Sequence, residues 1–336
     1  MRRKSLSIIL IISIFAIAFA SCEFQSADHS KTETSGPVGE SLLVKIAYDV
    51  APTHSLHESF LDLEQWLEAE SAGRIEVELY PLYELGDDAD LLALTAEGVI
   101  QMAVPQTSSL ASLSVEAPDE YPLDIPQSWQ IWDSLDGFYQ YDNAESAAAA
   151  VEGSLGAQMV ASLADLADQP FSCLGYAYEG PLAIGGTVDI LSPADLAGQR
   201  MALYGSPAWL SAYQSLGAEV VVLPLSEIYP ALAREQIDIY QATPENIATM
   251  HWTDYSNTII LTEHAYSFRP LLVNRQWYQS LSEEDAYLID TAVDNLLSQQ
   301  KTLAVERYQS SIDALKQQGI SVHSLTPEEQ ELWRNY

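Results

Sequence analysis

The sequence is short of two kinds of residue, cysteine and basic side chains. Among its 336 residues are 2 cysteines, and 14 Lys and Arg stand against 48 Asp and Glu, giving a formal net charge of −34. This acidity argues against nucleic acid and anionic lipid surfaces as partners, because both carry negative charge themselves. One of the two cysteines, Cys22, is expected to carry a lipid because of the motif described below. This leaves Cys173 without a partner, so no internal disulfide is expected.

Motifs for the common kinds of catalysis are also missing. The chain has no GxxxxGK[ST] phosphate loop, no GxGxxG fingerprint, no GxSxG elbow, no CxxC pair and no HExxH motif. His54 and His57 lie three residues apart, but no third metal ligand can be named, and capping or surface roles explain both. We therefore expect no catalytic residue, no cofactor and no bound metal.

A hydrophobic run follows the three basic residues at the N-terminus. Residues 6–20 suit the core of a signal peptide and are short for a membrane span. The run ends in FASC, which resembles a bacterial lipobox, so residues 1–21 are expected to be a signal peptide and Cys22 a lipidated residue. Residues 22–41 then form a flexible tether. We expect a protein on the periplasmic side, lipid-anchored to a bacterial membrane; an ordinary signal peptide is the alternative.

Strand and helix patterns alternate along the rest of the chain. LVKIAYD (43–49), RIEVELY (74–80) and VIQMAV (99–104) are typical of strands, and helical patterns separate them. A second set, QRMALY (199–204), EVVVLP (219–224) and IDIYQ (237–241), follows the same rule, and EVVVLP is typical of a buried strand. These patterns predict two α/β lobes with largely parallel sheets and a ligand cleft between them.

The last part of the chain is different. A helical pattern begins at Ser282 and continues to Gln318 without a firm break. Such a helix would be about 54 Å long at about 1.5 Å per residue, which exceeds one lobe. It is therefore expected to span both lobes.

Five motifs in order resemble one family. ELGDD (84–88), EGVIQMA (97–103), DLAGQRM (195–201), LSEIYPALAREQID (225–238) and NRQWYQSLSEED (274–285) are similar to the typical strings of solute-binding receptors of tripartite ATP-independent periplasmic (TRAP) transporters. The resemblance covers nearly all of residues 44–333. It implies an α/β, two-lobed periplasmic-binding-protein fold, with a ligand cleft between lobes and a long C-terminal helix spanning both.

The resemblance also implies a function and its partners. Such a receptor binds a small organic solute, closes on it and delivers it to integral-membrane TRAP subunits, and it is not an enzyme. We expect a monomer with lobe I formed by residues 42–179 and about 268–300, and lobe II by residues 180–267 and about 301–336. A sensor or scaffold lipoprotein that passes the ligand signal to a partner is the alternative function.

The family's ligand clamp is missing from this sequence. In most of the family, an arginine in a loop similar to NGxRxxT and another in a KIRVP strand hold the ligand's carboxylate. Without gaps, these positions fall at or beside Leu182 and on Ala202. The family's Asn in QENP falls on Ala242, and its Phe before SEVY falls on Leu225.

Three classes of ligand stay open on this basis. A neutral or apolar ligand would suit those four positions with the nearby aromatic residues Tyr48, Tyr204, Trp209 and Tyr240. A cationic ligand would suit the acidic positions Asp49, Asp88 and Glu179. A carboxylate would need a relocated clamp, for which Arg269 is the candidate, while Gln106 matches a polar cleft position of the family.

Overall fold

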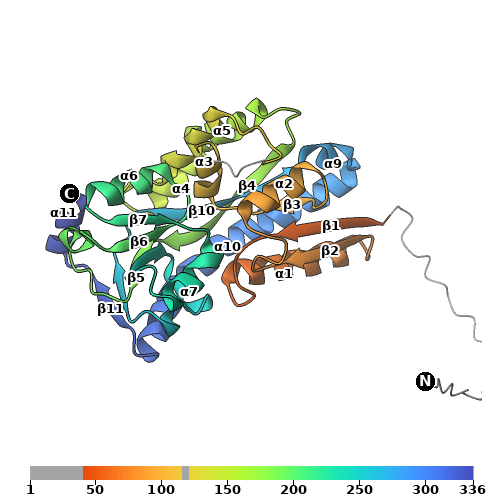
Figure 1. Ribbon diagram of the computed structural model, residues 1–336. Helices are drawn as coiled ribbons and strands as arrows, with labels where there is room; N and C mark the ends of the chain where they lie inside the picture. Colours follow the sequence, from red (N-terminus) through yellow and green to blue (C-terminus); the bar gives the residue numbers. More distant parts are fainter. Residues whose placement is uncertain (1–40, 116–120, 336) are drawn as a thin grey trace, which may run out of the picture. The chain divides into compact units, whose positions relative to one another are not determined.

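The computed structural model describes residues 41–115 and 121–335. The expected signal peptide, Cys22 and the tether up to residue 40 lie outside the described residues. Within them the chain forms two mixed sheets covered by helices, which we call lobe I and lobe II (Figure 1). None of the helices in the described ranges combines the length and the apolarity needed to cross a membrane.

Lobe I contains a five-stranded sheet of order β2-β1-β3-β10-β4. Its strands are β1 (Leu42–Ala47), β2 (Ile75–Tyr80), β3 (Met102–Ala103), β4 (Phe171–Pro181) and β10 (Tyr266–Asn274). The helices packed with it are α1 (Ser55–Glu70), α2 (Asp88–Ala96), α3 (Thr107–Leu113), α4 (Ala144–Glu152), α5 (Ser154–Ser162), α9 (Arg275–Ser280) and the 3₁₀ segments η1 (Gln127–Leu135) and η2 (Leu163–Asp165). The strand–helix alternation expected from 43 to 104 is confirmed.

Lobe II contains a six-stranded sheet of order β11-β9-β5-β8-β6-β7. Its strands are β5 (Ala183–Gly186), β6 (Arg200–Leu203), β7 (Glu219–Val222), β8 (Ile239–Ala242), β9 (Thr258–Leu261) and β11 (Ser321–Ser324). Its helices are α6 (Pro207–Ser215), α7 (Leu225–Ala233), α8 (Pro244–Thr249), α11 (Pro327–Arg334) and the 3₁₀ segments η3 (Pro193–Leu196) and η4 (Trp252–Asp254). EVVVLP forms the edge strand β7, with Val222 58% exposed, so its expected burial is wrong.

Two short crossings between the lobes make both sheets mixed, and not largely parallel as was expected. The chain passes from β4 in lobe I to β5 in lobe II at Leu182, and from β9 in lobe II back to β10 in lobe I at 262–265. β10 pairs antiparallel with β3 and β4, while β5 pairs antiparallel with β8 and β9. At the crossing, the Leu182 N–H donates to the Ala265 carbonyl at 2.9 Å, and the Glu263 N–H donates to the Leu182 carbonyl at 3.0 Å.

The third connection is the long helix α10 (Glu283–Gln317), which confirms the expected helix. Ser282 caps it by accepting from the Asp285 N–H, and three acidic residues in its first turn favour the helix dipole. Figure 1 shows α10, in blue, running from one sheet to the other. Its first half packs Val293 and Leu296 into the core of lobe I, and its last turns pack Leu315 into the core of lobe II.

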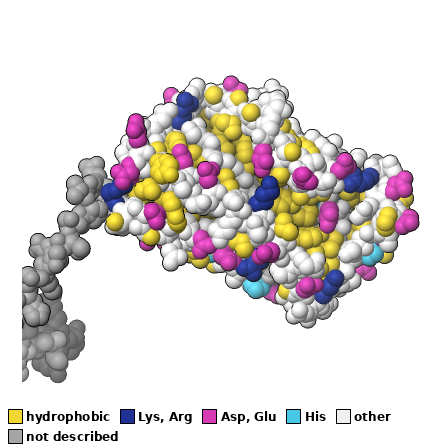
Figure 2. All heavy atoms as spheres, turned by 180° about the vertical axis from the view of Figure 1, so that it is seen from behind, with side chains coloured by type: hydrophobic (Ala, Val, Ile, Leu, Met, Phe, Trp, Pro, Cys, Tyr) yellow, Lys and Arg dark blue, Asp and Glu magenta, His cyan; other side chains and the backbone are white. Residues whose placement is uncertain are grey.

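On one face of the molecule, the acidic residues are spread out and do not gather in a single patch (Figure 2). On the face that Figure 2 shows, acidic side chains are scattered among hydrophobic and neutral areas, with a few basic side chains between them. This distribution is that of a solvated acidic surface, as its composition indicates.

Candidate functional site

A small cavity lies where the two lobes meet. Gln106, at the N-terminus of α3, and Ser267 of β10 contribute from lobe I. The rest of the wall comes from the crossing and from lobe II, namely Leu182, Tyr204, Trp209, Leu225, Gln241, Ala242, Thr243 and Asn246. The cavity encloses about 20 Å³, room for about one water-sized molecule. Any larger solute must therefore enter while the lobes stand further apart.

The part of the cavity wall that the structure describes is uncharged. Within the described part of the chain, its lining contains apolar, aromatic, amide and hydroxyl side chains and no Asp, Glu, Lys, Arg or His. Uncharged polar groups among apolar ones are typical of sites that orient a small ligand through a few hydrogen bonds.

Gln241 is the best-defined polar group of the wall. Its Oε1 accepts from the Tyr213 hydroxyl at 2.9 Å and lies 3.0 Å from Nε2 of His264. Burial lowers the pKa of His264 to about 3, so its ring is neutral. Its Nδ1 lies 2.7 Å from Oγ1 of Thr262, and the tautomer that accepts there donates from Nε2 to Gln241. With its oxygen occupied twice, Gln241 has its amide N–H groups left for a ligand.

Two more cavity-lining side chains carry unpaired polar atoms. Nε1 of Trp209, Oδ1 of Asn246 and Nε2 of Gln241 are all buried and have no hydrogen-bond partner among the residues that the structure describes. Trp209 lies in the first turn of α6, where its backbone N–H donates to Oγ of the cap residue Ser206. Asn246 lies in the first turn of α8, where its backbone N–H donates to Oγ1 of the cap residue Thr243. A buried polar group without a partner costs about 1–3 kcal/mol, so these three atoms favour a ligand that pairs them.

Arg269 lies behind this wall in a buried ionic cluster. Its Nη1 is 2.6 Å from Oδ1 of Asp49, and its Nε is 2.7 Å from Oε1 of Glu179. Nη1 also donates to the Val104 carbonyl at 3.2 Å. The three charged side chains are at most 2% exposed, and none of them lines the cavity.

The two carboxyl groups of this ionic cluster have pKa values that are shifted in opposite directions. Burial raises the pKa of Asp49 to about 7, and Arg269 opposes this shift only in part. Burial also acts to raise the pKa of Glu179, but Arg269, His54 and Ser267 more than offset it, and the pKa is lowered. Ser267 makes its contribution by donating from Oγ to Oε2 of Glu179 at 2.7 Å.

Asp88 connects the ionic cluster to the cavity wall. It is the first residue of α2, where Asp87 is the cap, and it is 1% exposed. Its Oδ2 accepts from the Gln106 N–H at 3.0 Å and from the Ser109 hydroxyl at 2.5 Å. Burial raises its pKa. Asp88 therefore positions Gln106 rather than lining the cavity itself.

The structure divides the residues expected at the site. Six line the cavity: Gln106, Leu182, Tyr204, Trp209, Leu225 and Ala242. Of the others, Tyr48 stacks on Phe60 with ring centroids 4.7 Å apart. Ala202 is 1% exposed in the core of lobe II, and the Tyr240 hydroxyl pairs with Ser256 at 2.7 Å. Asp49, Asp88, Glu179 and Arg269 lie behind the wall, as described above.

Four wall residues were not anticipated: Gln241, Thr243, Asn246 and Ser267. Gln241 is the last residue of the strand pattern IDIYQ, and Thr243 and Asn246 follow it, where Thr243 before Pro244 is a standard helix start. Loops and helix starts at the ends of such strands face ligands in α/β proteins. This signal could have identified them.

Comparison with known proteins agrees with this architecture. The model of bacterial extracellular solute-binding protein family 7 (DctP) matches residues 46–336. The C4-dicarboxylate-binding periplasmic protein DctP of Rhodobacter capsulatus is 23% identical over 88% of this chain and 84% of its own length. The 2,3-diketo-L-gulonate-binding periplasmic protein YiaO of Escherichia coli is 23% identical over 86% of this chain and 82% of its own.

A solved structure shares the fold. The sugar acid binding protein DctPAm of Advenella mimigardefordensis, in complex with galactonate, superposes with a TM-score of 0.79 at 19% identity, covering 88% of this chain and 90% of its own. Members of the matched family bind solutes for transport and are not enzymes. The chain therefore belongs to family 7 of the bacterial extracellular solute-binding proteins and is a periplasmic receptor of the TRAP type, which works with membrane TRAP subunits.

Proposed function

We propose that this receptor captures a small, uncharged, polar solute between its two lobes. The observation that carries the proposal is the cavity wall, which has no charged side chain within the described residues. Among the residues that the structure describes, the unpaired atoms of that wall are two donor nitrogens, Nε1 of Trp209 and Nε2 of Gln241, and one acceptor oxygen, Oδ1 of Asn246. A ligand with a carbonyl or ether oxygen and a hydroxyl or amide N–H would pair them, and its apolar part would contact Leu182 and Leu225.

A carboxylate ligand fits this wall poorly. The relatives from R. capsulatus and E. coli are named for a dicarboxylate and a diketogulonate. In this chain, the candidate clamp Arg269 already faces Asp49 and Glu179 at ion-pair distances. A carboxylate buried in the cavity would have no cation beside it, and an unpaired buried charge is penalised by several kcal/mol.

A cationic ligand also fits this wall poorly, because the acidic residues near the cavity already have partners. Asp49 and Glu179 pair with Arg269, and Asp88 accepts from Ser109 and from the Gln106 backbone. These acids stabilise the scaffold of lobe I and do not line the cavity. A ligand ammonium group would find hydroxyl and amide oxygens but no adjacent carboxylate.

Capture follows from the arrangement of the lobes. We infer that residues 42–181 with about 266–300, and residues 182–265 with about 301–336, move as two bodies about the crossings at Leu182 and 262–265 and about α10. The solute binds while the lobes are apart, and its contacts to Gln106 and Ser267 on one side and to Gln241 on the other then favour closure.

The test is a thermal-shift panel on the purified protein with neutral amides and polyols, carboxylates and amines. A solute at about 100 times its dissociation constant stabilises the folded state by about 2.7 kcal/mol, which moves the melting temperature measurably. We expect only uncharged solutes to raise the melting temperature. In Gln241→Leu the shift should be lost, whereas the control Gln214→Leu, at an exposed position of α6, should keep it. A shift caused by a carboxylate or an amine alone would contradict the ligand class.

We further propose that Cys22 carries a lipid that holds the receptor, as a monomer, at the membrane. The FASC sequence at residues 19–22 supports this. In cells given a labelled fatty acid, the wild-type chain should be labelled and partition with membranes. Cys22→Ser should abolish both. Equal labelling of the two would show that the anchor is wrong.

A further inference from the structure

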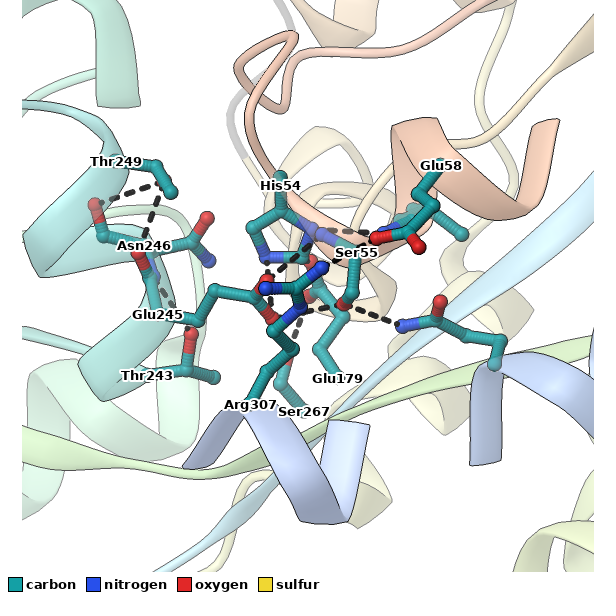
Figure 3. Close-up of polar contacts among 12 residues, drawn as sticks. His54, Ser55, Glu58, Glu179, Thr243, Glu245, Asn246, Thr249, Ser267 and Arg307 are labelled. Carbon is teal, nitrogen blue, oxygen red and sulfur yellow. Dashed lines mark hydrogen bonds and ion pairs between the residues drawn. The ribbon is translucent and has the colours of Figure 1, made fainter. Parts of the chain in front are cut away.

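A carboxylate of lobe II reaches the N-terminus of a helix in lobe I. Oε1 of Glu245, on α8, accepts from the Ser55 N–H at 2.7 Å, and Oε2 accepts from the Ser55 hydroxyl at 2.8 Å. Nε2 of His54, the cap of α1, lies 3.5 Å from the same Oε2. Figure 3 shows Glu245 facing His54 and Ser55 across this contact. Glu245 is 3% exposed, so water screens the contact little.

At a second contact between the lobes, the carboxylate belongs to lobe I and the helix start belongs to lobe II. Asp133 of η1 packs with lobe I through its neighbour Trp132, whose indole N–H donates to Ser162. Oδ2 of Asp133 accepts from the Ala208 N–H at 2.9 Å, and Oδ1 accepts from the hydroxyl of Ser206, the cap of α6 in lobe II. A carboxylate of lobe I therefore pairs with the first turn of a lobe II helix.

We propose that Glu245 and Asp133 are reciprocal latches that hold the two lobes closed. Each places a negative charge at the positive end of a helix in the other lobe, where it accepts two hydrogen bonds. Hydrogen bonds to a charged group are about twice as strong as neutral ones, and the helix dipole adds to them. Both contacts must break when the lobes separate, because their partners belong to different lobes.

The latches act beside the ligand cavity. Glu245 precedes the wall residue Asn246 on α8, and the Asp133 contact fixes the start of α6, from which Trp209 reaches the wall. The uncharged wall can give a solute neutral hydrogen bonds, whereas these interlobe contacts carry full charge. The protein therefore supplies part of its own closing energy. Glu245 and Asp133 are positioning residues that raise affinity by raising the population of the closed state.

The long helix α10 supports one of the latches. Nε2 of Gln300, which is fully buried, donates to Oγ of Ser55 at 3.2 Å and to the Tyr178 carbonyl at 3.1 Å, while its Oε1 accepts from Ser59. Ser55 in turn donates to Glu245. The side chain that Glu245 holds is thus fixed by the helix that joins the lobes.

Amide hydrogen exchange tests the proposal without any ligand. The Ser55 N–H and the Ala208 N–H are each covered by the other lobe's carboxylate, and both become free when the lobes open. In the purified protein with Glu245→Ala, we expect exchange at Ala208 to accelerate about tenfold, which corresponds to about 1.4 kcal/mol. Asp133→Ala should accelerate exchange at Ser55 in the same way.

The cross-effect separates a latch from a local role. Loss of a local contact would speed exchange only at the amide that lost its acceptor, so an unchanged Ala208 in Glu245→Ala and an unchanged Ser55 in Asp133→Ala would overturn the proposal. The matched control is Glu329→Ala, because Glu329 accepts from the Thr326 N–H at 2.7 Å at the start of α11, within lobe II. It should change neither amide. If one latch variant does not fold, the other still decides the outcome.

Discussion

The cavity wall and the ionic cluster behind it are neighbours with opposite chemistry. Ser267 lines the cavity and also donates to Glu179 of the cluster, so the two regions share a residue. The wall is uncharged within the described residues, whereas the cluster consists of the ionisable side chains Arg269, Asp49 and Glu179, each at most 2% exposed. The difference shows that charged residues near a cleft can serve the scaffold alone, with specificity left to amides and hydroxyls.

The ionic cluster should be most sensitive to loss of its cation. Arg269→Met leaves Asp49 and Glu179 buried without their counter-charge, and breaking a buried pair in this way costs about 3–5 kcal/mol of unfolding free energy. Denaturant unfolding measures the loss. Arg200→Met, which breaks a part-exposed pair with Asp238, is the control and should have a much smaller effect. Equal losses would mean that the buried cluster adds no stability of its own.

The ionic cluster should also make stability depend on pH. Burial raises the pKa of Asp49 to about 7 from 3.8, so between these values the folded state binds a proton that the unfolded chain has lost. Stability from this group is therefore present at low pH and lost as pH rises through about 4 to 7. Relative to Asp49→Asn, the wild type should lose unfolding free energy as the pH rises across that window. Urea midpoints at several pH values measure it, and parallel profiles would refute the assignment.

The shared residue provides a sharper comparison. Ser267→Ala removes the hydroxyl that donates to Glu179 at 2.7 Å, and a lost hydrogen bond to a charged group costs about 1.5–3 kcal/mol. Because Ser267 also lines the cavity, solute affinity should fall together with thermal stability. Ser280→Ala, at an exposed helix end, is the control for stability. An effect on affinity alone would place the Ser267 hydroxyl in the wall and not in the cluster.

A positive charge added to the cavity wall should make its chemistry more like that of the ionic cluster. Leu182→Arg places a cation at the crossing between the lobes, so the affinity for the neutral solute should fall about tenfold, or about 1.4 kcal/mol. The variant should at the same time acquire a thermal shift with small carboxylates. Ala202→Arg cannot do this, because Ala202 is 1% exposed in the core of lobe II, and it should simply destabilise the fold. An unchanged solute preference in Leu182→Arg would place Leu182 outside the binding site.

Much of the fold could be predicted from local pattern. The first strand–helix unit, the capped helix starts and the uninterrupted helix α10 all follow from periodicity and capping residues. The strand EVVVLP could not be placed, because a short apolar run has the same pattern at the edge of a sheet as in its centre. The mixed sheets were missed as well, because the direction of a strand depends on which distant strand it pairs with.

The site was predictable in part for a similar reason. Motif register placed Leu182, Leu225 and Ala242 at the cavity, and it also selected Ala202 and Tyr240, which face the core of lobe II. Tyr240 packs in the core of lobe II, whereas Gln241 and Ala242, the last two residues of β8, line the cavity. Motif register does not show how far along a strand the core ends and the cavity begins.

By itself, the sequence determined the family, the two α/β lobes and the long helix, because these depend on residue types and their spacing along the chain. The tertiary structure alone decided that Arg269 pairs with Asp49 and Glu179 and that the cavity wall, as far as the described chain forms it, is uncharged. It also decided that Glu245 and Asp133 cross between the lobes. The physical reason is that a charge acquires its role from the partners that folding brings within about 3 Å of it, and those partners are far apart in the sequence.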